Sequence, residues 1–524
     1  MKKTLLSLAL AAISTCTVNA NANTLPFIDH RNISFKQHVQ ARKINIKALA
    51  QYTEASVLNL SYSDIEDKDI PAIIEFLNAH PRISSLNLDG NNKLSSKGMV
   101  PLASVTTLSS LSLARTYKDC PKRVCIGGLE AKDMPAFANN TSLTSLNLFF
   151  HSIGDDGAIT LAKNRHLTEL NLLANNLTDR GGAALAEIQS LEKLSLGGDD
   201  VGSPTAIALA KNDALTYLFI GQTNMGDAGA IALAQSKHLS DLTLWYSNVG
   251  DAGAEALAKN TNIVHLDLSG THVGINGAKA LAVNTSITSL GLAGDFFGEP
   301  RSNDIGDAGA LAFSQNYSLH QLNLSSQQIT SAGAKELVKL PRVYDLKLAA
   351  NRKMGDEGAV VLSAHQYGWQ SLDLSACRLT DKGALAILKD APNHIPLHNF
   401  TANSNFISDA SAIALAHKNG LVDVELVANE IHDEGGLELA NFAHMHSLRV
   451  EFNRMSDITA MAIYNNHMID TVVAGGTNPY PPPTAAHLCN EKRPSSTNVN
   501  FCYRDANSAH CVNRDDLIYP RDTK

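Results

Sequence analysis

Apolar and polar residues follow a sequence repeat that recurs along almost the whole chain. A clear instance is residues 167–190, LTELNLLANNLTDRGGAALAEIQS. Its leucines alternate with polar residues, which predicts a short strand with one buried face. An asparagine turn and a Gly/Ala-rich segment follow. In that segment apolar residues fall at i, i+3 and i+4, as with Ala230, Leu233 and Ala234, which predicts a helix with one buried face.

The strand leucines recur at a nearly constant distance. From Leu146 to Leu290 the chain takes the same step of about 24 residues six times in succession, a length typical of solenoid repeats. A fixed period of this kind predicts a solenoid of about seventeen coils rather than several globular domains. From Leu346 to Val424 we expect longer coils, of about 26 residues each. The first residue of each L-x-L pair is assigned to Leu58, Leu86, Leu111, Leu146, Leu170, Leu194, Leu218, Leu242, Leu266, Leu290, Leu322, Leu346, Leu372, His398, Val424, Leu448 and Val472.

The repeat also predicts a shape. Neighbouring strands of a parallel sheet lie roughly 4.8 Å apart, whereas packed helices need roughly 8 Å or more. Each coil should therefore turn by roughly 15–20°, with the strands on the inner side. The expected fold is an α/β solenoid, a horseshoe with a concave parallel β-sheet and short convex α-helices.

Two polar ladders accompany the leucines. Asparagines at the turn should hydrogen-bond backbone groups of adjoining coils. They are Asn91, Asn175, Asn351, Asn429 and Asn453. Aspartates stand just ahead of a Gly-Ala helix start, where a carboxylate favours free N–H groups. They are Asp155, Asp179, Asp227, Asp251, Asp307 and Asp381. Every coil needs these residues whatever it binds, so we interpret both ladders as structural.

The two ends of the chain depart from the repeat. Residues 1–22 have a basic start (Lys2, Lys3), a short apolar run and an Ala20-Asn21-Ala22 cleavage site, which indicates a Sec-type signal peptide. A lipoprotein signal at Cys16 is disfavoured by Thr15. We assign residues 23–54 to an N-terminal cap, 55–474 to the solenoid and 475–524 to a cysteine-bearing C-terminal cap or tail. The protein is expected to be periplasmic or secreted.

Net charge and hydropathy argue against nucleic acid as a partner and against a membrane-spanning segment. Cleavage after Ala22 removes two lysines and takes the formal net charge from −8 to −10. An acidic protein is a poor candidate for binding nucleic acid through bulk electrostatics. Beyond the signal peptide no stretch is apolar enough to span a bilayer, so we do not expect a membrane-spanning protein.

The pattern L-x-x-L-x-L-x-x-N-x-(I/L/V)-x-D-x-G-A-x-x-L-A resembles the ribonuclease-inhibitor-like class of leucine-rich repeats, and in particular the short bacterial version known as GALA repeats. The string GALA itself occurs at residues 309–312 and 383–386. The resemblance covers roughly residues 56–475 and implies a protein-binding scaffold, with a host-directed role. GALA proteins of plant pathogens also carry an F-box and act as ubiquitin-ligase adaptors, but residues 23–54 show no convincing F-box.

Aromatic residues interrupt the small and polar residues that flank the strand leucines. Such residues are enriched at binding hot spots. We therefore predict that the concave face holds a partner protein, or a surface glycan. The residues are Phe149, Phe150, Tyr217, Phe219, Trp245 and Tyr246, joined by His265 and Asp267.

Two insertions also lengthen the period. One, between Leu290 and Leu322, carries the apolar pair Phe296 and Phe297 and offers a second contact loop. The other, between Leu111 and Leu146, contains Cys120 and Cys125, which would form a disulfide in an oxidising compartment. Either insertion is also explained as a tolerated surface loop.

The remaining cysteines have separate settings. Cys377 stands at a turn position that other coils give to asparagine and should be a buried free thiol. The pairing of Cys489, Cys502 and Cys511 stays open. Together with His487 and His510 they would also suit zinc, but disulfides are the better interpretation for an exported chain.

No catalytic motif, metal site or cofactor signature stands in a fitting context. His444 and His446 form the nearest metal-like pair, without supporting ligands. We therefore expect a non-enzymatic, exported binding scaffold. The alternative is an adaptor-like or enzymatic effector whose activity lies in the caps, with the repeats selecting the substrate. A structural envelope protein without a single ligand is a third possibility.

Overall fold

The structure is a computed structural model that describes residues 33–34, 56–91, 93–116, 127–198, 200–294, 303–389, 395–442, 445–466, 468–474, 498–504 and 509–512. The chain divides into two compact units, Met1–Leu266 and Asp267–Lys524, called unit 1 and unit 2 below. The division falls within β10 (His265–Asp267). Each unit is described by itself.

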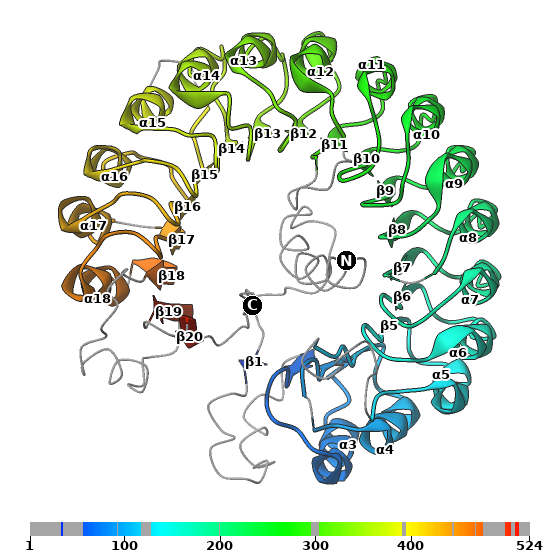
Figure 1. Cartoon of the computed structure of the whole chain (residues 1–524). Helices are drawn as coiled ribbons and strands as arrows, with labels where there is room; N and C mark the ends of the chain where they lie inside the picture. The colour runs from blue at the N-terminus through cyan, green and yellow to red at the C-terminus, as the bar shows by residue number, and fades with distance from the viewer. Residues whose placement is uncertain are drawn as a thin grey trace, which may run out of the picture. The chain divides into compact units, whose positions relative to one another are not determined.

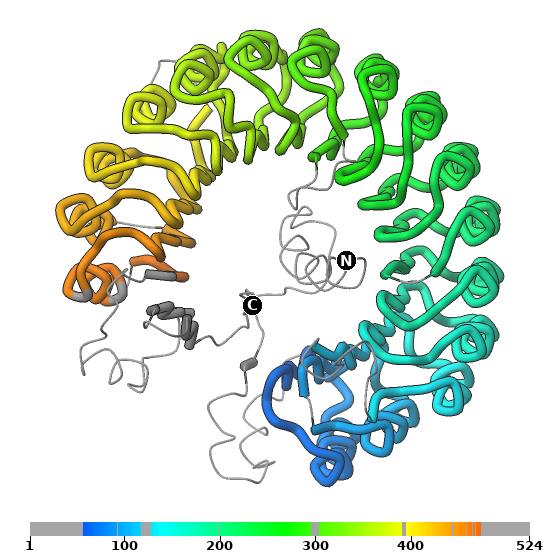
Figure 2. The backbone as a smooth tube through the Cα atoms, in the orientation of Figure 1, coloured from blue at the N-terminus to red at the C-terminus, as the bar shows by residue number. Residues whose placement is uncertain are grey.

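Unit 1 is built of coils in which a short strand on the inner side is followed by a helix on the outer side (Figure 1). Figure 2 shows the backbone of each coil passing from strand to helix and back to the next strand. The strands are β1 (Ile33–Ser34), β2 (Val57–Asn59), β3 (Ser85–Asn87), β4 (Ser110–Ser112), β5 (Ser145–Asn147), β6 (Glu169–Asn171), β7 (Lys193–Gly197), β8 (Tyr217–Gly221) and β9 (Asp241–Thr243). The α-helices and 3-10 helices (η) are η3 (Asp67–Asp69), α3 (Ile70–Ala79), α4 (Ser96–Met99), η4 (Val100–Ser104), η7 (Ala131–Asp133), α5 (Met134–Ala138), α6 (Gly154–Leu161), α7 (Asp179–Leu185), α8 (Ser203–Leu209), α9 (Gly226–Leu233) and α10 (Asp251–Leu257).

Unit 2 repeats the same construction. Its strands are β11 (Ser289–Gly291), β12 (Gln321–Asn323), β13 (Asp345–Lys347), β14 (Ser371–Asp373), β15 (Asn399–Thr401), β16 (Asp423–Glu425), β17 (Met445–Arg449), β18 (Ile469–Ala474), β19 (Asn498–Arg504) and β20 (Ala509–Val512). Its helices are α11 (Ile275–Ala282), α12 (Gly306–Phe313), α13 (Ser331–Leu337), α14 (Gly355–Leu362), α15 (Asp381–Leu388), α16 (Asp409–Ala416), α17 (Asp433–Leu439) and α18 (Asp457–Asn465).

The strand leucines form the core of both units. Leu146, Leu170, Leu194 and Leu218 pair in register across β5 to β8, and all four are buried. The predicted parallel solenoid is thus confirmed at the level of individual residues. Burial of each leucine removes apolar surface from water and stabilises the coil by roughly 2 kcal/mol.

One predicted register position is wrong. The structure pairs Leu372 with Phe400 and Phe400 with Val424, so Phe400 and not His398 is the buried strand residue. The coil from Leu372 to Phe400 is therefore longer, and the coil from Phe400 to Val424 shorter, than the equal lengths that we predicted. The averaged spacing concealed this shift because an even displacement leaves the alternation of faces unchanged.

The turn asparagines bridge consecutive coils as expected. Asn351 Nδ2 donates to the carbonyl of Leu324 in the preceding coil at 2.9 Å, and its Oδ1 accepts from the backbone N–H groups of Gln327 and Ile329. In the coil that begins with Leu372, Cys377 takes the turn position that Asn351 holds in the preceding coil. It is a buried free thiol whose Sγ lies 3.1 Å from the carbonyl oxygen of Leu348, as predicted.

The aspartate ladder is structural, but its partners differ from the prediction. Asp227 Oδ1 accepts hydrogen bonds from Gly250 N (2.7 Å) and Gly253 N (2.9 Å), which belong to the start of α10. The carboxylate therefore caps the helix of the next coil and not its own. Asp155 does the same for Thr178 and Gly181 at α7. This contact joins one coil to the next on the outer side, opposite the sheet.

Residues toward each end of the chain add strands to the sheet within their own unit. β1 pairs in parallel with β2 in unit 1. In unit 2, β19 pairs in parallel with β18 and antiparallel with β20, and the backbone register sets Cys502 opposite Cys511. The rest of the predicted caps lies outside the described residues, as does the insertion with Cys120 and Cys125.

Candidate binding surface

The inner face of unit 1 presents two side chains from each strand, one on either side of the buried leucine. Across β5 to β9 the first of them are Ser145, Glu169, Lys193, Tyr217 and Asp241, aligned strand by strand. The second positions hold Asn147, Asn171, Ser195, Phe219 and Thr243. All of these residues are half-buried. Because the coils are in register, neighbours on each ladder are roughly 4.8 Å apart.

β8 and the turn after β9 together supply an aromatic cluster, which we define as Tyr217, Phe219, Trp245 and Tyr246. Tyr217 and Phe219 both lie on β8, with the buried Leu218 between them. Trp245 and Tyr246 pack edge to face with ring centroids 4.8 Å apart. The four side chains are half-buried, so each keeps surface for a partner. The predicted grouping of these residues is thus consistent with their placement on adjacent coils.

Glycines beside this cluster were not identified from the sequence. Gly197 and Gly221 occupy the position that holds Phe149, Leu173 and Trp245 in neighbouring coils. A Cβ on Gly221 would lie 3.0 Å from both the ring of Phe219 and the carbonyl oxygen of Trp245, so the Phe219 ring rests over Gly221. A Cβ on Gly197 would collide with the carbonyl oxygen of Gly221. Both positions therefore require glycine, because neighbouring groups of the protein occupy the space of a side chain. The unusual Gly-Gly pair at residues 197–198 was the signal in the sequence.

Gln222 lies next to the cluster and has an unusual environment. Its backbone N–H donates to the carbonyl oxygen of Trp245 at 2.6 Å, and its φ is +56°. Among the described residues, neither the oxygen nor the nitrogen of its buried side-chain amide has a hydrogen-bond partner. A buried amide without partners costs about 1–3 kcal/mol, which marks this as a place where the fold accepts a local penalty.

Charged groups surround Tyr217. Burial raises the pKa of its phenol to about 12, and the carboxylates of Asp241 and Glu169 add to the effect. The phenol therefore stays protonated at neutral pH and can donate or accept a hydrogen bond. His265 Nε2 lies 3.9 Å from Asp241 Oδ1 and borders the same patch.

The remaining predicted residues separate from the cluster. Phe149 is half-buried but follows β5, three strands from β8 and so roughly 14 Å away. Phe150 was wrongly assigned to the exposed face: only 2% of its surface is accessible, and it packs against Phe149 with centroids 5.4 Å apart. With φ +63° its side chain turns into the coil after the strand ends.

Asp267 is the first residue of unit 2 and has a local role there. Its Oδ1 accepts a hydrogen bond from Ser269 N at 2.8 Å and lies against Gly291. Phe296 and Phe297 lie outside the described residues. His446 Nδ1 pairs with Asp423 Oδ1 at 2.8 Å, and no cluster of three or more metal-ligating side chains exists in the part of the chain that the structure describes.

No helix of the described segments combines the length and hydrophobicity needed to cross a bilayer.

Comparison with known proteins concerns the fold of the chain. Residues 139–162, 163–186, 259–282 and 370–388 match the family described as Leucine Rich repeat. No curated protein matches the chain.

Three solved structures are similar to this chain at low identity. The complex of Rad7 and Elc1 from yeast is 18% identical, covers 63% of this chain and 88% of its own, and has a TM-score of 0.41. An internalin (InlF) from Listeria monocytogenes is 19% identical over 66% and 88%, with a TM-score of 0.36. The ectodomain of the Arabidopsis receptor kinase HAESA, in complex with a peptide hormone, is 18% identical over 77% and 72%, with a TM-score of 0.38. The matched repeats and the strand-by-strand register together identify a chain of leucine-rich repeats with the leucine-rich-repeat solenoid fold.

Proposed function

We propose that this protein is a binding scaffold that holds a partner protein on the inner sheet face of unit 1, through the aromatic cluster. One observation carries the proposal. Two consecutive coils present Tyr217, Phe219, Trp245 and Tyr246 half-exposed at places where most coils carry small or polar residues. Tyrosine and tryptophan on a rigid surface provide large contact area at a low cost in side-chain entropy.

The surroundings of the cluster favour a protein over an unspecific apolar contact. Gly221 lets the Phe219 ring lie against the backbone, and Gly197 leaves room for the carbonyl oxygen of Gly221, so the two glycines hold the cluster in a fixed arrangement. Lys193 and Asp241 flank Tyr217 on the neighbouring strands, and Glu169 lies one strand beyond Lys193, so charges of both signs border the apolar anchor and favour a partner with polar groups around it. The scaffold is proposed to act outside the cytoplasm after export, in a host-directed interaction, and we assign it no reaction.

The partner is identified by site-specific crosslinking. A photoreactive benzoylphenylalanine replaces Phe219 on the inner face or, as the matched control, Ile231, which is exposed on α9. We expect a discrete crosslinked protein from cell-envelope or host extracts with the probe at 219 and not at 231. A glycan partner would instead give no crosslinked polypeptide but retention on a glycan array.

Affinity for the identified partner then tests the cluster. Replacing both Trp245 and Tyr246 by alanine should weaken binding about thirtyfold or more, as expected when hot-spot residues are truncated. Ile231→Ala should leave affinity unchanged. Equal affinity of the double variant and the wild type, with unaltered circular dichroism, would exclude the inner-face site.

A further inference from the structure

In many coils an asparagine side chain holds the backbone that leads from the helix into the next strand. Before β12, Asn316 Oδ1 accepts a hydrogen bond from Ser318 N at 2.9 Å, and its Nδ2 donates to the carbonyl oxygen of Ala282 in the preceding coil at 2.8 Å. We call this contact the asparagine clamp. The asparagines that accept in the same way from the backbone N–H two residues further on are Asn140, Asn164, Asn212, Asn260, Asn284, Asn316 and Asn466.

The connection between α16 and β16 lacks the asparagine clamp. Lys418 stands at the equivalent place before β16, and its Nζ donates to the carbonyl oxygen of Leu388 in the preceding coil at 3.0 Å. The lysine thus replaces the bond between coils. An ammonium group cannot accept a hydrogen bond, so Lys418 cannot hold the N–H of Gly420 as Asn316 holds that of Ser318. The side-chain acceptor that restrains this N–H group in other coils is therefore missing at Gly420.

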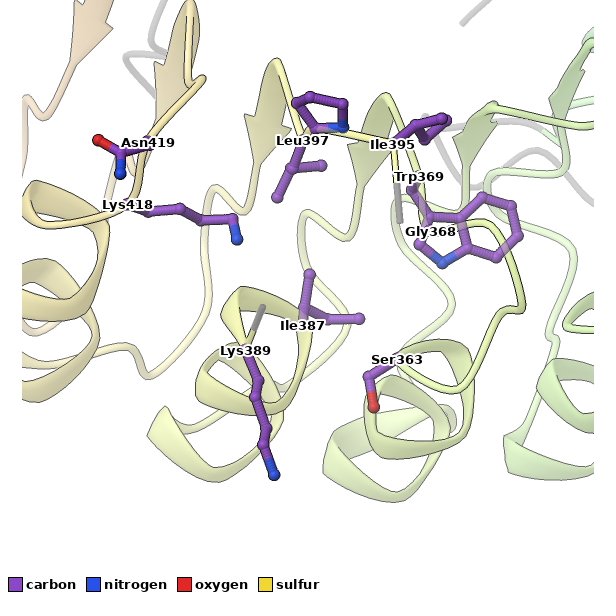
Figure 3. A pocket seen from close by; sticks show the side chains of 10 residues that line it. Ser363, Gly368, Trp369, Ile387, Lys389, Ile395, Leu397, Lys418 and Asn419 are labelled. Atoms are coloured by element: carbon purple, nitrogen blue, oxygen red, sulfur yellow. The ribbon is translucent and has the colours of Figure 1, made fainter. Parts of the chain in front are cut away.

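The residue that precedes this N–H group is also an asparagine. Asn419 and Gly420 are both exposed, and Gly420 has φ +87°. Figure 3 shows the connection beside a cavity of about 240 Å³, with the side chains of Asn419 and Lys418 pointing in different directions. The backbone nitrogen that follows an asparagine can attack Cγ of its side chain, and glycine allows this approach best because it has no Cβ. The missing clamp therefore coincides with a reactive Asn-Gly pair.

The chain contains a second Asn-Gly pair in a different setting. Asn276 and Gly277 lie at the start of α11. Asn276 is exposed, as Asn419 is, but Gly277 is buried in the helix. Attack on the side chain requires the asparagine to rotate out of the helical backbone conformation, so the first turn of α11 must open beforehand. The two pairs share their sequence and differ in how the fold restrains them.

We propose that Asn419 deamidates spontaneously in the folded protein because this connection lacks the asparagine clamp. The Gly420 nitrogen forms a bond to Cγ of Asn419, the bond from Cγ to Nδ2 breaks, and ammonia leaves with the proton of the Gly420 N–H group. Solvent water then opens the cyclic imide at either of its carbonyl groups and gives aspartate or isoaspartate. Isoaspartate adds a backbone carbon to the connection that leads into β16. The reaction is separate from the partner surface of unit 1 and does not depend on it.

The rates at the two Asn-Gly pairs test the proposal. The full-length protein is incubated in mildly alkaline buffer, either folded or unfolded in guanidinium chloride. Digestion at acidic residues keeps Asn419 inside its peptide, and mass spectrometry after separation of aspartate and isoaspartate measures the conversion at each pair. In the folded protein we expect Asn419 to react nearly as fast as in the unfolded chain. Asn276 should be slowed by folding at least about tenfold, which corresponds to about 1.4 kcal/mol of local opening. Equal slowing of the two pairs, or faster reaction at Asn276, would overturn the proposal.

Matched variants of Lys418 test the cause. Lys418→Asn restores the acceptor and should slow the reaction of Asn419 in the folded protein about threefold to tenfold, as one added hydrogen bond would. Lys418→Met has a side chain of similar length without such an acceptor and should react as the wild type does. In guanidinium chloride all three chains should react alike, and circular dichroism confirms that the variants fold. Equal rates at Asn419 in the two folded variants would overturn the proposal.

Discussion

At equivalent positions of different coils, one residue type can take over the hydrogen bonds of another. His151 occupies the turn position that Asn175 and Asn351 hold elsewhere, and it makes the same two kinds of bond. Its Nδ1 accepts from Leu129 N at 3.1 Å, and its Nε2 faces the carbonyl oxygen of Leu113 at 2.9 Å. Only a neutral imidazole protonated at Nε2 satisfies both partners. Burial lowers the pKa of His151 to about 3, and the charge of Arg115 adds to this, while the Leu113 carbonyl opposes it.

This histidine should make unit 1 sensitive to mild acid. Below pH 6.5, the ordinary pKa of histidine, His151 is protonated in the unfolded chain. In the folded chain its lowered pKa keeps it neutral down to about pH 3. Stability is therefore fully present above pH 6.5 and falls as the pH falls through this window, by about 2 kcal/mol at pH 5. An asparagine in the His151→Asn variant should keep both hydrogen bonds and has no group that binds a proton in this pH range. The urea midpoint at pH 7 and pH 5 measures the loss, and an equal loss in the asparagine variant would contradict the assignment.

At the scale of elements, successive helices are joined by a carboxylate and a glycine. Asp227 caps α10, and Gly253 lets its carboxylate approach. A Cβ at Gly253 would lie 2.6 Å from Val249 Cγ1 and 2.8 Å from Asp227 Oδ1. The glycine of the Gly-Ala motif therefore does more than allow close helix packing. It leaves room for the aspartate of the preceding coil to reach the backbone N–H groups at the start of the helix.

The cap predicts a contrast between two neighbouring glycines. Gly253→Ala should destabilise unit 1 by about 1–3 kcal/mol, because the methyl group displaces the carboxylate and crowds Val249. Gly250→Ala is the matched control, since its methyl group would meet Asp227 only at 3.4 Å. Thermal unfolding followed by circular dichroism measures both. Similar melting temperatures for the two variants would show that the cap tolerates the added group.

At the scale of the whole molecule, each unit extends its sheet strand by strand, and an edge strand needs protection. In unit 2 the antiparallel hairpin of β19 and β20 follows β18, and the backbone register sets Cys502 opposite Cys511. Directly opposed residues of an antiparallel pair have Cα atoms about 4.5–5.5 Å apart, within the range that a disulfide bridges. Joining two thiols in a disulfide requires a two-electron oxidant, and oxidising compartments outside the cytoplasm supply one.

The proposed export and this register together predict the covalent state of the chain. We expect the protein recovered from the cell envelope or medium to begin at Asn23 and to carry a Cys502–Cys511 disulfide, with Cys377 still a thiol. Intact mass and non-reducing peptide mapping measure both features. Cys511→Ser should abolish the bridge, whereas Cys377→Ser should leave it. A retained residue 1–22 segment would contradict export, and free thiols at 502 and 511 in an exported chain would contradict the pairing.

The sequence by itself determined the solenoid, the buried leucines and the polar ladders, because a fixed period forces equivalent residues of every coil into one environment. It also predicted that Tyr217 and Phe219 share one face through the alternation of a strand, with Trp245 and Tyr246 after the strand of the next coil. Only the tertiary structure decided which coil each group contacts. Phe150 is buried because the chain takes a left-handed turn after β5. Phe400 replaces His398 in the core, and Asp227 caps the helix of the next coil. These outcomes depend on contacts between coils, which spacing along the chain does not specify.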